Sequence, residues 1–295
     1  TASGLSNSLR ATVTTVDTSI AAGEYSVINQ SIEGYNVADL VGNTFTLSFW
    51  VRSSKTGIHC VRFTNSIGDR SYVSEYVITT ANTWEKKVIV VTGGIPNNGT
   101  WNYTIGLGLS IEWALAAGTT FQTTNPNSWT SSNMLATANQ VNCLDTVGNI
   151  FAITGVQLEK GSSATDFEFR PYQVELAMCH RYFVIHGNVT SGIGAYTIGR
   201  GVSNGSTSGW RTKIDVPVAM RTAPTLTAVN LIGWSPGVAN STLNSISAIY
   251  AINGMLVEAD LVYSSNTGVS GGSASYLQTN PNGSPTYLAI SAELF

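Results

Sequence analysis

Residues 44–52 read TFTLSFWVR, and this stretch decides the fold. Every second residue is apolar, which is the period of a β-strand whose side chains point alternately to two faces of a sheet. The apolar face carries Phe45, Leu47, Phe49 and Val51. The other face carries Thr46, Ser48, Trp50 and Arg52. We therefore expect a strand with one face in a hydrophobic core and a tryptophan on the opposite face.

The same alternation recurs on either side of this stretch, up to about residue 170. It is found in residues 71–80 (SYVSEYVITT), 85–92 (EKKVIVVT), 101–113 (WNYTIGLGLSIEW) and 151–159 (FAITGVQLE). Clusters of Gly, Asn and Pro separate these segments, at spacings typical of sandwiches and barrels. Strand patterns do not alternate with helical ones here, which disfavours a parallel α/β sheet. The sequence predicts an all-β first domain over residues 1–170.

One segment, residues 171–183 (PYQVELAMCHRYF), has the pattern of a helix. Pro171 suits a first helical turn, and Glu175 lies near the positive end of the helix dipole. Apolar residues form two stripes, which indicates two packing partners. The helix could connect a domain to other chains, or it could be wedged between the two domains of one chain.

Strand patterns resume after the helix and predict a smaller antiparallel sandwich over residues 184–295. Residues 248–263 (AIYAINGMLVEADLVY) predict a hairpin, because Asn253 and Gly254 can adopt the positive φ angles of a tight turn. Residues 287–295 (YLAISAELF) predict a last strand that reaches the final residue. With 295 residues, two compact domains are the expected organisation.

The composition excludes several classes of protein. Only 11% of the residues are charged and the net charge is -3, so no basic surface is available for nucleic acid. No apolar run is long enough to span a membrane, and residues 1–10 lack a signal-peptide pattern, so we expect no membrane insertion. Cys60, Cys143 and Cys179 have no metal-site spacing, and we expect free thiols made in a reducing cytoplasm.

Four separated segments together resemble a family of bacteriophage tail-fibre and receptor-binding proteins. They are residues 44–53 (TFTLSFWVRS), 70–89 (RSYVSEYVITTANTWEKKVI), 153–183 (ITGVQLEKGSSATDFEFRPYQVELAMCHRYF) and 216–227 (VPVAMRTAPTLT), in the order of the family. The likeness covers roughly residues 30 to 225. The family often has Gln where this chain has His180, and Pro where it has Asp166.

The resemblance implies an N-terminal jelly-roll sandwich similar to carbohydrate-binding modules over residues 1–170, a connector helix over 171–183, and a C-terminal β domain forming the fibre tip over 184–295. It implies attachment of the virion to a host-surface polysaccharide or lipopolysaccharide. The implied partners are other copies of the chain, as a homotrimer, and other virion proteins, and the implied location is the tail fibre. No cofactor is implied, apart from a structural calcium ion by analogy with similar jelly rolls.

A sugar-binding jelly roll uses flat aromatic rings against the apolar face of a pyranose and polar groups for its hydroxyls. The predicted glycan-binding residues are Trp50 and Arg52 on the polar side of their strand, Trp84 after a turn, Trp129 in a polar loop, and Trp210 at the start of a strand. For Trp50, the alternative is that loops cover this face and make it a second core residue.

No catalytic residue is predicted, and we expect a protein that is not an enzyme. The seventeen acidic residues are dispersed and the three histidines form no recognisable triad. Two other hypotheses remain: a purely structural virion or decoration protein without a ligand, in which the aromatic residues are packed inside, and a polysaccharide depolymerase.

Overall fold

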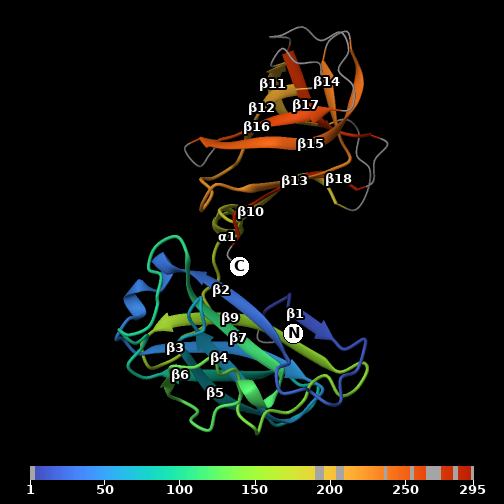
Figure 1. The fold of residues 1–295 in the computed structure, drawn as a ribbon. Coiled ribbons are helices and arrows are strands. Elements are labelled where there is room, and N and C mark those ends of the chain that lie inside the picture. The colour runs from blue at the N-terminus through green and yellow to red at the C-terminus, as the bar shows by residue number, and fades with distance from the viewer. Residues whose placement is uncertain are drawn as a thin grey trace. The chain divides into compact units, whose positions relative to one another are not determined.

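A computed structural model describes residues 4–189, 196–203, 209–235, 238–252, 256–263, 274–281 and 285–293. The described chain is made mostly of antiparallel strands and has one α-helix, which confirms the predicted all-β class with a single helix (Figure 1). It divides into two compact units, the first ending at Phe169 and the second running from Arg170 to Glu293.

The first unit is a sandwich of two antiparallel sheets. A four-stranded sheet has the order β1-β9-β3-β6, and a five-stranded sheet has the order β2-β7-β4-β5-β8. The strands are β1 (Leu9–Thr12), β2 (Tyr25–Glu33), β3 (Phe45–Ser53), β4 (Gly57–Thr64), β5 (Ser71–Ile78), β6 (Glu85–Val91), β7 (Leu107–Ala117), β8 (Trp129–Thr130) and β9 (Ile150–Lys160).

The hydrophobic core of the first unit lies between its two sheets. The predicted apolar face of β3 is confirmed, since its four apolar side chains are completely buried there. The ring of Phe49 packs edge-on against Trp113 of β7, with the ring centroids 5.6 Å apart. Burial of a side chain of this size contributes roughly 1.5–3 kcal/mol.

The second unit contains the helix, a small sheet and a barrel. The helix α1 (Tyr172–His180) is followed by strands that form a three-stranded sheet, β10-β18-β13, and a closed barrel, β11-β12-β16-β15-β14-β17. The strands are β10 (Phe183–Asn188), β11 (Thr197–Ser203), β12 (Gly209–Asp215), β13 (Thr225–Val229), β14 (Leu231–Ser235), β15 (Val238–Ile252), β16 (Leu256–Tyr263), β17 (Ala274–Thr279) and β18 (Thr286–Ser291).

Closure of six strands into a barrel refines the sequence expectation for the second unit. Alternation predicts which side chains face inward, but not whether the first and last strands of a sheet meet. In the barrel the buried ring of Trp210 lies against Tyr263, with centroids 4.4 Å apart. Closure lets the first and last strands pair through their backbone N–H and C=O groups, whereas the edge strands of an open sandwich keep these groups unpaired.

Two boundary predictions in the second unit can be compared with the structure. β15 and β16 pair antiparallel up to Ile252 and Leu256, as a hairpin requires, but the predicted turn at Asn253 and Gly254 lies outside the described residues. The predicted last strand is shorter than expected, because β18 ends at Ser291.

The helix begins at Tyr172, one residue later than predicted, because Pro171 has an extended ψ of 135°. It ends at His180, and β10 begins at Phe183. Within its unit the helix buries no residue completely, and Val174 and Met178 are exposed. In the described part of the chain, no helix has the length and hydrophobicity needed to cross a lipid bilayer.

Candidate functional site

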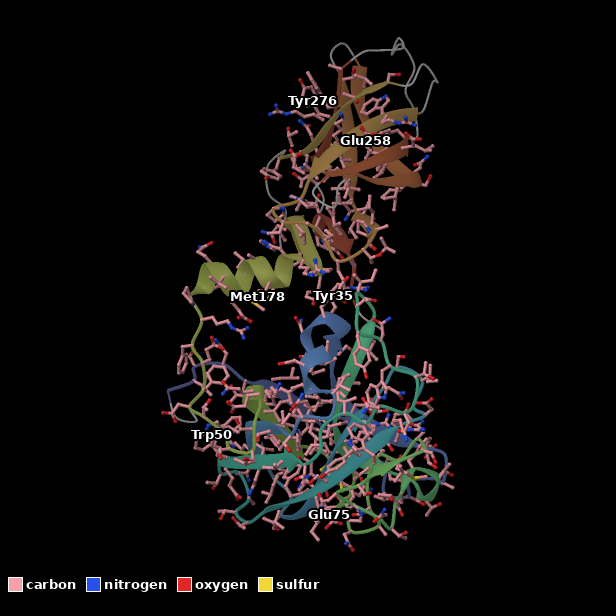
Figure 2. All side chains as sticks on the ribbon, turned by 90° about the vertical axis from the view of Figure 1, so that its left-hand side faces the viewer. Tyr35, Trp50, Glu75, Met178, Glu258 and Tyr276 are labelled. Atoms are coloured by element: carbon pink, nitrogen blue, oxygen red, sulfur yellow. The ribbon has the colours of Figure 1, made fainter. Side chains whose placement is uncertain are left out.

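Trp50 lies on the outer face of the four-stranded sheet and is half-buried (Figure 2). Beside it, β9 has a bulge at which Gly155 adopts a φ of +56°. A Cβ atom at Gly155 would lie 2.6 Å from Cδ1 of Leu5, 3.3 Å from Cδ1 of Trp50 and 3.8 Å from Cδ2 of Phe167. The three side chains therefore converge over this glycine, and Trp50 is half-buried among the segments around it.

The segment that follows β9 also attaches to this outer face. The hydroxyl of Thr165 donates to a carboxylate oxygen of Glu159 at 2.7 Å, and the backbone N–H of Glu168 donates to Gln157 at 2.9 Å. The hydroxyl of Thr46 on β3 donates to the carbonyl of Gly161 at 2.7 Å. Thr46 is completely buried although it lies on the polar side of its strand. The polar side of β3 is thus largely covered.

Arg52 and Trp84 lie near the same face. Arg52 is half-buried, and its Nε atom has no hydrogen-bond partner in the described part of the chain. Trp84 directly precedes β6 and is also half-buried. Because Val51 pairs with Glu85, Arg52 and Trp84 occupy the next positions along β3 and β6. The structure brings Trp50, Arg52 and Trp84 to one region of the sheet.

Trp129 lies apart from that group and is not a free loop residue. It begins the short strand β8 and pairs with Tyr72 of β5. Its indole N–H donates to the carbonyl of Gly94 at 2.8 Å, and its ring lies 5.5 Å from the rings of both Tyr72 and Trp101. The half-buried indole packs against the core of the first unit.

The prediction of Trp210 as a glycan-binding residue is wrong. This side chain is 1% exposed and belongs to the core of the second unit. The alternation of β12 turns it toward the barrel interior, together with Thr212 and Ile214. Its position after a polar segment gave no information on which side of the strand the indole faces.

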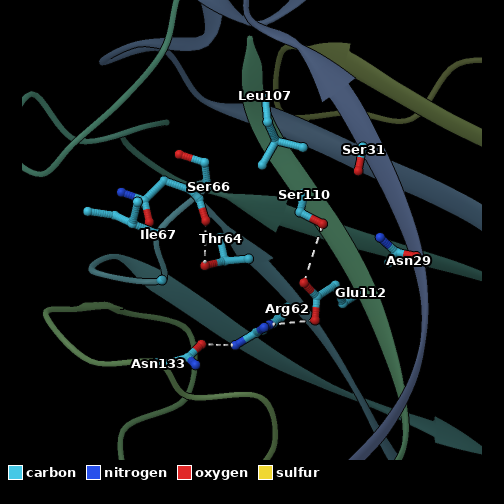
Figure 3. Close-up of a pocket in the computed structure, with 12 residues that line it drawn as sticks. Asn29, Ser31, Arg62, Thr64, Ser66, Ile67, Leu107, Ser110, Glu112 and Asn133 are labelled. Carbon is cyan, nitrogen blue, oxygen red and sulfur yellow. Dashed lines mark hydrogen bonds and ion pairs between the residues drawn. The ribbon is translucent and has the colours of Figure 1, made fainter. Parts of the chain in front are cut away.

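The outer face of the five-stranded sheet has a different character, because it is polar and hollowed by a cavity. Three adjacent strands contribute one residue each to two rows that run across the sheet. One row is Asn29–Glu112–Arg62, and the other is Ser31–Ser110–Thr64. These six side chains share one face and form the floor of a cavity of about 280 Å³ (Figure 3). We call this the polar cavity.

An ion pair lies at the floor of the polar cavity. Arg62 Nε donates to Glu112 Oε2 at 2.9 Å, and the two residues are 7% and 8% exposed. Nη1 of Arg62 donates to the side-chain oxygen of Asn133, and also to the carbonyl of Met134 at 3.3 Å. The hydroxyl of Ser110 donates to Glu112 Oε1 at 3.3 Å. These bonds hold both charged side chains in place and make the floor electrically neutral.

The walls come from the residues that follow β4, from Asn133 and from the first residue of β7. They are formed by Asn65, Ser66, Ile67, Gly68, Leu107 and Asn133. Ile67 is 64% exposed and provides an apolar surface beside the polar floor. No aromatic residue is among the residues that line this cavity. A mostly polar, neutral lining suits a ligand rich in hydroxyl groups better than an apolar or charged one.

Sequence reasoning missed the polar cavity. The signal was present as polar residues at every second position in NQS (29–31), RFT (62–64) and SIE (110–112). Alternation places each pair on one face of its own strand. Only the order and register of β2, β7 and β4 bring the three pairs together, and these strands are far apart in the sequence.

Among the described residues that line the cavity, there is neither a metal cluster nor a second acid. Glu112 is the one carboxylate among the residues that line it. Within the described residues, no group of three or more His, Cys, Asp and Glu side chains is arranged to hold a metal ion. The calcium ion suggested by analogy stays a prediction.

A further titratable cluster lies inside the sandwich. His59 is completely buried, its ring stacks on Tyr76 with centroids 5.7 Å apart, and its Nδ1 atom lies 3.8 Å from Sγ of Cys143. Burial lowers the pKa of His59 below its usual value of 6.5 and raises the pKa of Cys143 to about 12. Both groups are neutral core residues at neutral pH.

Comparisons with known proteins leave the function open. Searches against protein-family models and against the sequences of curated proteins give no match. Among solved structures, the chain matches one described as "Cell entry of botulinum neurotoxin type C is dependent upon interaction with two ganglioside molecules". The match has 11% sequence identity and a TM-score of 0.19, and it covers 97% of this chain and 94% of that chain. Such a score supports no argument, so the function must be inferred from the chain's own residues.

Proposed function

We propose that this protein is a non-enzymatic attachment protein that binds a neutral carbohydrate in the polar cavity of its first unit. The observation that carries the proposal is the pair of polar rows across β2, β7 and β4, fixed by the buried Arg62–Glu112 pair. Preorganised donors and acceptors in a concave site are what a hydroxyl-rich ligand needs. Ile67 offers an apolar surface to the C–H face of a sugar ring.

The biological setting is proposed from the sequence resemblance alone. In this proposal the chain is the distal part of a phage tail fibre, assembles as a homotrimer, and recognises host polysaccharide or lipopolysaccharide. Each site would be weak, and the fibre would be effective because several sites engage one surface together. Light scattering tests the assembly, and a monomer would contradict it.

The binding proposal is tested with purified protein on an array of bacterial glycans. Asn29 is exposed at the cavity and opposite Glu112, so Asn29→Ala should weaken binding of any positive glycan by about tenfold. Gln30→Ala is the matched control, because Gln30 is also exposed but lies on the other face of the same strand. No binding to any glycan, or equal effects of both variants, would contradict the proposal.

A second function has one observation in its favour. Trp129 and Trp210 pack into the two cores, and the side chains of Trp50, Leu5 and Phe167 converge over Gly155, as expected if the protein were a structural virion component without a ligand. The same array separates the two functions, since a structural component would bind none of the glycans. For hydrolysis by two carboxylates, the polar cavity offers only Glu112.

A further inference from the structure

The Arg62–Glu112 pair at the floor of the polar cavity leaves hydrogen-bonding capacity unused. Arg62 donates through Nε and Nη1, while its Nη2 atom makes no hydrogen bond to a described residue. Glu112 Oε2 is used by Arg62, and Oε1 accepts one long bond from a described residue, Ser110. One unused donor and one underused acceptor therefore belong to two side chains that are directly opposite each other on β4 and β7.

The chemistry of this pair restricts what it can bind. A guanidinium group can only donate, and a carboxylate can only accept. A hydroxyl group can do both. Two neighbouring hydroxyl groups of a ligand can therefore bind the pair together. The first hydroxyl accepts a hydrogen bond from Arg62, and the second donates one to Glu112. An anionic ligand gains little, because the positive charge of Arg62 is already matched by Glu112 at 2.9 Å.

The neighbours of the pair keep it in this arrangement. Asn133 and the carbonyl of Met134 hold Nη1 of Arg62 on the side away from Glu112. Ser110 holds the carboxylate from its own strand. Both charged side chains are thus positioned before a ligand arrives, so little ordering is required on binding.

We propose that the Arg62–Glu112 pair selects neutral sugars through two adjacent hydroxyl groups. This inference rests on the proposed carbohydrate-binding function and goes beyond it, because it names the two residues that determine specificity and the chemical feature they recognise. A sugar that lacks either hydroxyl leaves Nη2 of Arg62 or Oε1 of Glu112 without its hydrogen bond to the ligand, and this is the basis for rejection.

The test uses the full chain and calorimetric titration with methyl glycosides of glucose, galactose, mannose, rhamnose and N-acetylglucosamine, with methyl glucuronide as the anionic probe. For each sugar that binds, its monodeoxy analogues are then titrated. We expect removal of either of two adjacent hydroxyls to weaken binding by at least about tenfold, and removal of another hydroxyl to change it by less than about threefold. Equal, small effects at every position would overturn the inference.

A variant pair makes the assignment to these residues testable. Glu112→Gln should reduce the penalty for removing the hydroxyl that donates to Glu112, because a neutral amide oxygen is a weaker acceptor than a carboxylate, and should leave the penalty at the hydroxyl that accepts from Arg62. A thermal melt checks that the variant is folded. Glu85→Gln is the matched control, since Glu85 forms a comparable ion pair with Lys87 at 2.7 Å outside the cavity. The control should keep the full discrimination.

The outcomes separate this inference from the proposed function. If a sugar binds and Asn29→Ala weakens it, but deoxy analogues bind as well as the parent, only the inference on the adjacent hydroxyls fails. If none of the glycosides binds, both fail. If Glu112→Gln does not fold, the deoxy series on the unchanged protein still decides the question.

Discussion

The two outer faces of the sandwich in the first unit differ in how they are covered. On the four-stranded sheet, Trp50 lies beside Leu5 and Phe167, and Thr46 is completely buried. On the five-stranded sheet, the rows that contain Arg62 and Glu112 form the floor of a cavity at which Asn29 is exposed. The sequence pattern of β3 suggested a ligand face on the first sheet, but the cavity lies on the second. Alternation shows which side chains of a strand share a face. Whether that face is covered depends on segments elsewhere in the chain that pack over it.

The largest effect is expected from breaking the ion pair on the five-stranded sheet. Glu112→Ala leaves the Arg62 guanidinium buried without its carboxylate and should lower the free energy of unfolding by about 3–5 kcal/mol. Urea denaturation followed by circular dichroism measures this. Replacing both residues by Leu should recover most of the loss, because a well-packed apolar pair avoids the desolvation cost. An unchanged midpoint for Glu112→Ala would show that the pair is not buried in solution.

A smaller effect is expected on the covered face. Phe167→Ala removes a half-buried ring next to Trp50 and should cost about 1–2 kcal/mol. It should also increase the quenching of Trp50 fluorescence by acrylamide. The contribution of Trp50 is obtained by subtracting the fluorescence of the same protein carrying Trp50→Phe. Tyr35→Ala is the control, since Tyr35 is 60% exposed and lies in another segment, so it should change both quantities less. Equal effects of the two variants would mean that Phe167 does not cover Trp50.

The stability of the first unit should depend on pH, because His59 is buried in its core. Burial lowers the pKa of His59 in the folded protein, so the unfolded chain takes up a proton first as the pH falls below 6.5. The free energy of unfolding should therefore decrease on acidification, by at most about 1.4 kcal/mol per pH unit from this group. His59→Gln should flatten the decrease between pH 7.5 and 5.5. A slope that is identical in the variant would exclude His59 as the cause.

The smallest effect concerns a single contact of the covering segment. Lys86 Nζ lies 3.5 Å from the carbonyl of Thr165, and the side chain is exposed. Lys86→Ala should change the free energy of unfolding by less than about 0.5 kcal/mol, since exposed polar contacts contribute little. Hydrogen exchange of the segment 161–168 should increase slightly at most. A loss above about 1 kcal/mol would mean that Lys86 is needed to hold the segment on the sheet.

More of the fold than of the candidate site could be predicted from the sequence. The apolar face of β3, the all-β class and the helix near residue 172 follow from local periodicity, and all three agree with the structure. The closed barrel and the polar cavity depend on the pairing of strands that are distant in sequence. Trp210 shows the limit most clearly, because a tryptophan next to a polar segment can still face the interior.

The polar cavity also bears on how such a molecule can diversify. Along β2, Asn29 and Ser31 line the cavity, while Ile28 and Ile32 pack against the core. Under the proposed function, neighbouring residues of β2 therefore serve two separate purposes, contact with the ligand on one face and packing of the core on the other. If the cavity binds a host glycan as proposed, substitutions at positions 29 and 31 would change the bound ligand without creating a void in the interior, and one scaffold could follow a changing cell surface while it keeps its fold.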